Sequence, residues 1–312
     1  MNIFITGLTG FIGSFIVQAL TRNESNIVGY AVDLFAKELI EKKGYHSCVN
    51  LNDLPEIDVC IHLAARVHQM KDRSKDPMSE YRRVNVDFAL DTAREALKKG
   101  VKKFIFISSV KVYGNDSGVF DESSLFSPDD NYGISKYEAE KSLIDLFNNQ
   151  NIAQLIILRF PMVYGPGNKG NILTLLKAAK KNIYLPLSTA VNKRSFLYVG
   201  NIASAIKRII DFEVQEKIQA YNLTDADDLS SAELYSLISS QIKCKKLLFP
   251  IPDWIIKLLS AISNKFNQIE SRLFGEYRFS NKKFCQAYDW TPTYSVEDGI
   301  KDTVNWFLSK ED

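Results

Sequence analysis

The strongest constraint on the fold comes from a glycine-rich turn near the start of the chain, between an apolar segment and a helical one. Residues 2–5 form a short apolar run, which predicts a buried strand. Gly7, Gly10 and Gly13 follow, and apolar residues then recur at helical spacing over 14–20. This order predicts a dinucleotide pyrophosphate site, because a helix N-terminus presents free N–H groups to phosphates. The spacing G-x-x-G-x-x-G also fits a plain turn of another α/β protein, so the motif alone does not decide between the two.

Strand-like and helical segments alternate over the first half of the chain. The predicted strands cover 26–32, 57–65, 103–107 and 153–158, and the predicted helices cover 34–43, 78–99 and 132–148. Such alternation predicts right-handed βαβ units and an α/β fold with a doubly wound parallel sheet.

The pattern changes after residue 165. Helices are expected over 171–181 and 199–212, strands over 195–199 and 219–223, and a mostly helical tail from 230 that includes 252–274. No Pro-, Gly- or Ser-rich linker separates the two halves, so we expect a smaller, intertwined C-terminal lobe. The predicted dinucleotide-binding domain is 1–165 plus about 195–225, and the predicted substrate lobe is 166–194 plus about 226–312.

Composition excludes several classes of function. The 312 residues carry 39 basic and 37 acidic side chains, a net charge of +2 that indicates neither a nucleic-acid nor a membrane partner. Four scattered cysteines, without a C-x-x-C motif, predict buried thiols and no metal site. No signal-peptide pattern or long apolar window is present, so we expect a cytoplasmic protein.

Three reactive residues are expected at the carboxyl edge of the sheet. Ser109 follows the predicted strand 103–107, and Tyr132 and Lys136 stand at i and i+4 near the start of a helix. An unperturbed tyrosine has a pKa of about 10, and a nearby ammonium favours the phenolate and should lower that pKa. Such a tyrosine can exchange a proton with a carbinol oxygen while Ser109 polarises the carbonyl. A Y-x-x-x-K match alone arises by chance on surface helices, but all three residues behind a glycine turn form a more specific set.

The chain resembles the extended short-chain dehydrogenase/reductase family, the group of nucleotide-sugar epimerases, dehydratases and reductases. The matching stretches are TGLTGFIG at 6–13, HLAA at 62–65, VNV at 84–86, SSVKVYG at 108–114, YGISK at 132–136, RFPMVYGP at 159–166 and RSF at 194–196.

The resemblance implies a role for each matching residue. Tyr132 would be the acid/base, Lys136 would bind the nicotinamide ribose and lower the tyrosine pKa, and Ser109 would contact the reacting oxygen. The implied cofactor contacts are Gly7, Thr9, Gly10, Phe11, Ile12, Gly13, Asp33, Leu63, Ala64, Ala65, Asn85, Tyr132, Lys136, Pro161 and Val163. The implied substrate contacts are Arg66, Ser109, Asn171 and Arg194, of which Arg194 would hold the sugar-nucleotide diphosphate, with Lys193 as a more mobile second cation. Asp33 would accept hydrogen bonds from the ribose and favour NAD over NADP.

Three departures from the family pattern narrow this interpretation. Val110 and Lys111 stand where family 4,6-dehydratases carry Asp-Glu, which argues against dehydration. Met162 replaces an asparagine common in epimerases and dehydratases. Gly200 replaces a common acidic residue, and we assign no mechanistic meaning to this replacement. Signatures at 62–68, 108–112, 169–173 and 192–195 look like those of bacterial surface-polysaccharide reductases that act on UDP-4-keto-6-deoxy-N-acetylhexosamines.

Three functions therefore remain open. The first is reduction of a 4-keto UDP-sugar, and the second is 4-epimerisation with tightly held NAD. The third is a non-catalytic dinucleotide sensor, since a fold alone does not fix function. His68 is most simply a loop histidine. The helices expected at 78–99 and 132–148 resemble the pairing helices of the family and imply a homodimer.

Overall fold

The protein was analysed as a computed structural model. The structure describes residues 1–21, 26–30, 34–67, 74–150, 153–188, 192–244, 248–250 and 275–310. Asp33, His68 and the segment 252–274 lie outside these residues.

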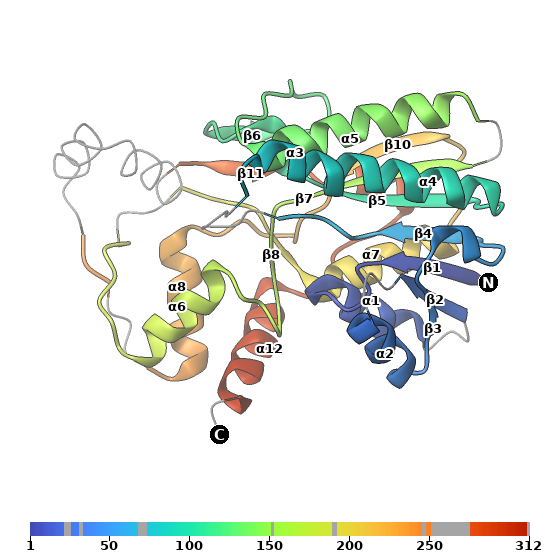
Figure 1. Cartoon of the computed structure of the whole chain (residues 1–312). Helices are drawn as coiled ribbons and strands as arrows, with labels where there is room; N and C mark the ends of the chain where they lie inside the picture. Colours follow the sequence, from blue (N-terminus) through green and yellow to red (C-terminus); the bar gives the residue numbers. More distant parts are fainter. Residues whose placement is uncertain are drawn as a thin grey trace.

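The centre of the molecule is a seven-stranded parallel sheet with the order β10-β7-β5-β4-β1-β2-β3 (Figure 1). Its strands are β1 (Asn2–Thr6), β2 (Asn26–Tyr30), β3 (His46–Cys48), β4 (Val59–His62), β5 (Lys103–Ser109), β7 (Gln154–Phe160) and β10 (Ile218–Asn222). The strand order reverses between β1 and β4, and in sheets of this kind ligands bind at that point, beyond the carboxyl ends of the strands.

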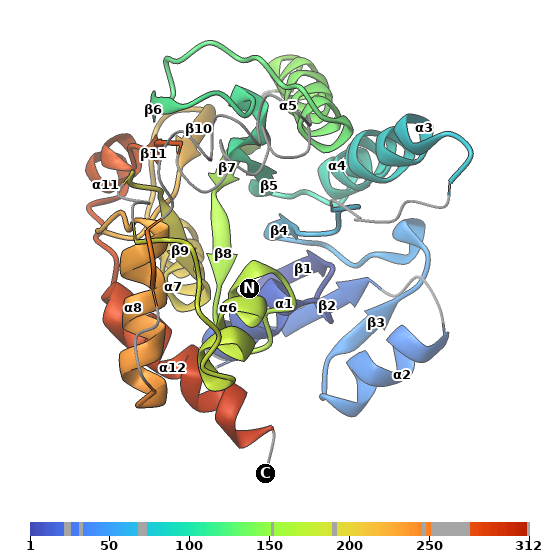
Figure 2. The same ribbon diagram turned by 90° about the vertical axis from the view of Figure 1, so that its left-hand side faces the viewer.

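Helices cover both faces of the sheet (Figures 1 and 2). One face packs against α1 (Phe11–Leu20), α2 (Leu34–Lys42), α7 (Val199–Asp211) and α11 (Lys282–Tyr288). The other face packs against α4 (Phe88–Lys98) and α5 (Asn131–Asn148), with α3 (Pro77–Arg82) before them. Ala89, Ala93 and Ala96 are fully buried on one side of α4, and their small side chains let the helix lie close to the strands.

A second hydrophobic cluster lies beyond the carboxyl edge of the sheet. It joins α6 (Asn171–Lys180), α8 (Ser231–Ile242) and α12 (Val296–Ser309) to the paired strands β8 (Met162–Tyr164) and β9 (Phe196–Tyr198). A further pair, β6 (Gly118–Phe120) and β11 (Tyr277–Phe279), connects the tail of the chain to the loop before α5.

The structure corrects several expected boundaries. The helix expected over 78–99 is interrupted by a π-turn at Arg83–Asp87, and it ends before Gly100, whose φ is +79°. The strand expected over 57–65 ends at His62, so Leu63, Ala64 and Ala65 follow it as a loop. The short strands β3, β6, β8 and β11 were not predicted, because three residues are too few to show a period.

The part of the chain that the structure describes contains no helix long and apolar enough to cross a membrane. It also contains no group of three or more His, Cys, Asp or Glu side chains that could hold a metal ion.

Candidate active site

The glycine-rich turn lies between β1 and α1, beside the loop that follows β4. Gly7 has a φ of +72°, and a Cβ there would lie 3.0 Å from the backbone nitrogen of Ala64. A Cβ at Gly13 would lie only 2.4 Å from the carbonyl oxygen of Gly7, so α1 packs against the turn itself. Thr9 and Gly10 are exposed at the tip. The bare turn and the helix N-terminus fit the pyrophosphate of a dinucleotide, because side chains would fill the space that the phosphates need.

The loop 63–65 is fixed against this turn by a buried threonine. The hydroxyl of Thr6 accepts a hydrogen bond from the backbone N–H of Ala64 at 3.2 Å and contacts Nδ1 of His62 at 3.1 Å. Leu63, Ala64 and Ala65 are half-buried, as expected for residues that line one wall of a crevice.

The structure brings Ser109, Tyr132 and Lys136 together at the carboxyl edge of the sheet. Ser109 is the last residue of β5, and the other two lie one turn apart on α5, which begins at the Asp130 cap. The Ser109 hydroxyl hydrogen-bonds the phenol of Tyr132 and lowers its pKa, but burial dominates and raises the pKa of Tyr132 to about 12. Tyr132 is therefore protonated at neutral pH.

The expectation that Lys136 lowers the pKa of Tyr132 is wrong for this structure. The Lys136 ammonium donates to the carbonyl of Ile107 at 2.7 Å and lies 4.5 Å from the ring of Phe106. Burial lowers the pKa of Lys136 to about 7, and the charge of Glu140 acts in the opposite direction. The i, i+4 spacing placed both residues on one helix face, but it could not predict which acceptor the long lysine side chain reaches.

Asn85 holds the framework of the site. It lies in the π-turn, a feature that is frequent at functional sites. Its amide donates to the Ser135 hydroxyl at 2.9 Å and to the carbonyl of Arg66 at 3.1 Å, and its oxygen accepts from the backbone N–H of Arg66 at 2.7 Å. Asn85 thus ties α5 to the loop after β4. The guanidinium of Arg66 lies 5.4 Å from the ring of Tyr81.

The remaining expected cofactor contacts, and the expected substrate contact Asn171, lie in α1, around β8 and at the start of α6. Phe11 packs against the cluster of that lobe, and a Cβ at Gly167 would lie 3.5 Å from its ring. Ile12 is half-buried against the core of the sheet. Pro161 is buried between β7 and β8, Val163 is half-buried in β8, and Asn171 is the exposed first residue of α6.

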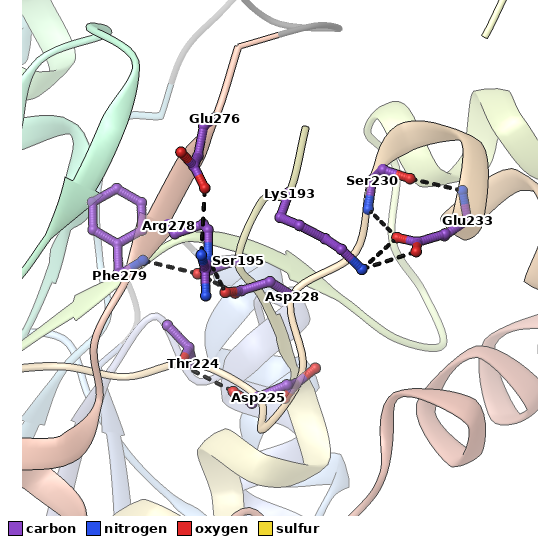
Figure 3. A network of polar contacts seen from close by, with 10 residues as sticks. All are labelled: Lys193, Ser195, Thr224, Asp225, Asp228, Ser230, Glu233, Glu276, Arg278 and Phe279. Atoms are coloured by element: carbon purple, nitrogen blue, oxygen red, sulfur yellow. Dashed lines mark hydrogen bonds and ion pairs between the residues drawn. The ribbon is translucent and has the colours of Figure 1, made fainter. Parts of the chain in front are cut away.

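Arg194 is half-buried and bridges to Leu229 and Tyr277 through its backbone. Its guanidinium donates to the carbonyl of Gly275 at 3.2 Å and lies 5.2 Å from the ring of Tyr277. Lys193, which we expect to be a more mobile second cation, forms an exposed ion pair with Glu233 of α8 at 2.8 Å (Figure 3).

Sequence reasoning missed a buried ion pair behind the reactive residues. Arg159, near the end of β7, and Glu140, in the middle of α5, lie 2.7 Å apart, and the Ser108 hydroxyl donates to the same carboxylate at 2.5 Å. The signal was present, because Glu140 stands four residues after Lys136 and therefore on the same helix face.

Comparisons with known proteins agree with this geometry. The family model described as the NAD dependent epimerase/dehydratase family matches residues 3–224. A UDP-glucose 4-epimerase of Vibrio cholerae is 33% identical over 98% of this chain and 95% of that protein. An N-acetyl-alpha-D-glucosaminyl-diphospho-ditrans,octacis-undecaprenol 4-epimerase of Escherichia coli O157:H7 is 27% identical over the same shares of the two chains.

Solved structures show the same fold. The UDP-glucuronic acid 4-epimerase of Bacillus cereus in complex with NAD has a TM-score of 0.78 at 20% identity, covering 100% of this chain and 98% of that one. The UDP-N-acetylglucosamine 4-epimerase of Bacillus cereus has a TM-score of 0.79 at 19% identity, covering 99% of both chains. The predicted α/β fold with a doubly wound parallel sheet is confirmed.

Proposed function

The chain belongs to the NAD dependent epimerase/dehydratase family, and from this premise we propose that it reduces a 4-keto group on a UDP-sugar with a nicotinamide cofactor. The observation that carries the proposal is the phenol of Tyr132 hydrogen-bonded to Ser109 at the carboxyl edge of the sheet. A phenol in this position can give its proton to a ketone oxygen while the serine hydroxyl polarises the carbonyl.

The protein supplies binding, orientation and a proton. Gly7, Gly10 and Gly13 would admit the pyrophosphate, and Leu63–Ala65, Asn85, Pro161 and Val163 would form the walls of the cofactor site. NAD, when bound, supplies or accepts the hydride. Tyr132 donates its proton to the oxygen on carbon 4, Ser109 polarises the same oxygen, and Lys136 orients the nicotinamide ribose.

The proposed substrate is a UDP-4-keto-6-deoxy-N-acetylhexosamine of surface polysaccharide synthesis. Val110 and Lys111 in place of an acidic pair support reduction over elimination. Arg194 would hold the diphosphate, and Arg66 and Asn171 would contact other parts of the substrate. We assign 1–165 and about 195–225 to cofactor binding, and 166–194 and about 226–312 to substrate binding, although α11 packs on the central sheet.

A 4-epimerase is the second candidate, and the Vibrio cholerae relative favours it. In that case the same residues would hold one NAD tightly, and the bound cofactor would supply reversible hydride exchange at carbon 4. NADP is the alternative cofactor, and a much lower Kd for NADPH than for NADH would select it.

One experiment separates the candidates. Purified protein is tested for retained NAD by absorbance, and is then mixed with NADH or NADPH and a UDP-4-keto sugar. The proposal expects cofactor oxidation in proportion to sugar reduced. Stoichiometric retained NAD, without net consumption of the added cofactor, would identify the epimerase. Cofactor binding without turnover of either the UDP-4-keto sugar or a UDP-hexose would identify the non-catalytic sensor.

A further inference from the structure

Tyr277 lies where three segments of the chain meet. As the first residue of β11 it pairs with Gly118 of β6 on one side. On the other side, its N–H donates to the carbonyl of Lys193 at 3.0 Å and its carbonyl accepts from the N–H of Ser195 at 3.0 Å. The backbone of Arg194 is thereby held against β11.

Neighbouring polar contacts make this attachment firm (Figure 3). The hydroxyl of Ser195 accepts from the N–H of Phe279 at 2.9 Å and donates to Asp228 at 2.5 Å. Arg278 donates to the other oxygen of Asp228 at 2.6 Å. The segment that carries Arg194 is therefore fixed to β11 on both sides of that residue.

Two cationic side chains lie close to the ring of Tyr277. The side chain is only 8% exposed, and the guanidinium of Arg194 lies 5.2 Å and the ammonium of Lys111 5.7 Å from its centre. These two cations come from different lobes, because Lys111 lies two residues after Ser109. An aromatic face attracts cations, so the ring limits where both charges can lie.

The hydroxyl of Tyr277 reaches the segment that begins at Ser109. It donates to the carbonyl of Gly114 at 2.5 Å and lies 3.4 Å from that of Val110. These carbonyls stand at the two ends of the short helix η4 (Val110–Tyr113), whose N-cap is Ser109. The Tyr277 side chain thus contacts Arg194, the residue proposed to bind the diphosphate, through its ring. Through its hydroxyl it contacts the segment that begins at Ser109.

We infer that Tyr277 is a positioning residue that orients Arg194 toward the substrate diphosphate and fixes the position of Ser109 relative to Arg194. The inference rests on the proposed function, since it requires Arg194 to meet a UDP-sugar. The ring and the hydroxyl have separable tasks: the ring sets affinity for UDP, and the hydroxyl sets the rate of the chemical step.

Two substitutions of Tyr277 and one matched control test the inference. Tyr277→Leu removes the ring and should raise the Kd for UDP about 3- to 30-fold by calorimetry, the size of a lost cation–π contact. Tyr277→Phe keeps the ring and should hold the Kd within about twofold, while kcat falls about two- to tenfold for one lost hydrogen bond. Phe284→Leu removes a fully buried ring in α11 that packs against Tyr221, Tyr288 and Trp290, so it should lower thermal stability without changing the Kd for UDP.

A double-mutant cycle with Arg194→Ala gives the sharper readout. The Arg194→Ala variant should bind UDP about 10- to 150-fold more weakly, and Tyr277→Leu should add little in that background. Equal UDP affinity of wild type and Tyr277→Leu, or an equal loss of UDP affinity in Phe284→Leu, would show that Tyr277 serves packing alone and would leave the proposed function standing. A wild-type protein that does not bind UDP would overturn both.

Discussion

The phenol of Tyr132 lies between the Ser109 hydroxyl and the ring of Tyr81, whose centre is 6.5 Å away. Burial of this phenol disfavours its charged form more than the serine hydrogen bond favours it. The residue therefore rests in the form that donates a proton. The Lys136 ammonium donates to the Ile107 carbonyl at 2.7 Å.

At the residue scale, Tyr132→Phe should remove most of the activity and leave the fold intact. The change deletes the proton donor and keeps the ring, so kcat should fall about 10²–10⁴-fold while the Kd for NADH stays within about twofold. Tyr137→Phe on the same helix is the matched control and should keep full activity, because the Tyr137 ring lies against Phe126 instead. A Tyr132→Phe enzyme with more than about a tenth of the wild-type kcat would refute the assigned role.

At the scale of elements, the closest packing in the cofactor region is that of α1 on the turn before it. Gly13 is the first buried residue of α1, and the carbonyls of Gly7 and Leu8 lie where its Cβ would be, at 2.4 and 2.7 Å. A backbone carbonyl cannot rotate away as a flexible side chain can. The position of the helix N-terminus over the turn therefore depends on a glycine there.

Gly13→Ala should move α1 outward and weaken both stability and cofactor binding. Overpacking of this kind costs about 1–3 kcal/mol, which urea unfolding would measure, and NADH titration should show a weaker complex. Gly170→Ala before α6 is the control, because its Cβ would meet its nearest atom at 3.5 Å, an ordinary contact. Unchanged NADH affinity in Gly13→Ala would mean that the turn does not bind the pyrophosphate.

At the scale of the whole molecule, the centre of the sheet contains a histidine that stays neutral. His62 is fully buried, with its ring stacked 6.3 and 5.9 Å from Phe104 and Phe106. Burial lowers the pKa of His62 to about 3, and the charge of Lys136 adds to the effect. The unfolded chain would bind a proton here below about pH 6.5, and the folded chain would not. His62 therefore makes the molecule less stable as the pH falls from about 6.5 toward 3.

His62→Phe should remove that acid sensitivity while keeping an aromatic ring between its neighbours. Relative to wild type, the free energy of unfolding of the variant should gain about 1.4 kcal/mol between about pH 5.5 and pH 4.5, because one proton is no longer taken up on unfolding. Urea unfolding at the two pH values measures the difference. A constant offset between the two proteins would show that His62 titrates normally in the fold.

The same scale includes the proposed assembly. The helices α4 and α5 lie together on one face of the molecule (Figure 1), and the exposed pair Arg82–Glu138 joins α3 to α5 at 2.6 Å. A two-fold axis over this face would form a four-helix contact. Light scattering at micromolar concentration should give twice the 35.4 kDa mass of one chain, and a mass of one chain would exclude the dimer.

Features that are local in the chain could be predicted from the amino-acid sequence alone. The glycine turn, the alternation of strands and helices, and the positions of Ser109, Tyr132 and Lys136 all follow from spacing within a few residues. Short-range periodicity reports backbone geometry directly, and parallel strands bring their carboxyl ends to one edge whatever the details of packing. These constraints were enough to predict the fold class and the edge of the sheet at which Ser109, Tyr132 and Lys136 lie.

Contacts between residues far apart in the sequence became visible in the folded structure alone. The acceptor of Lys136, the partner of Lys193 and the burial that raises the pKa of Tyr132 depend on which elements pack nearby. Tyr277 comes from β11, too short to show a pattern, and its neighbours Arg194 and Lys111 lie far from it in sequence. A long side chain can contact several alternative partners at similar free energy. Because the packing of distant elements determines which partner it meets, local spacing in the sequence does not predict it.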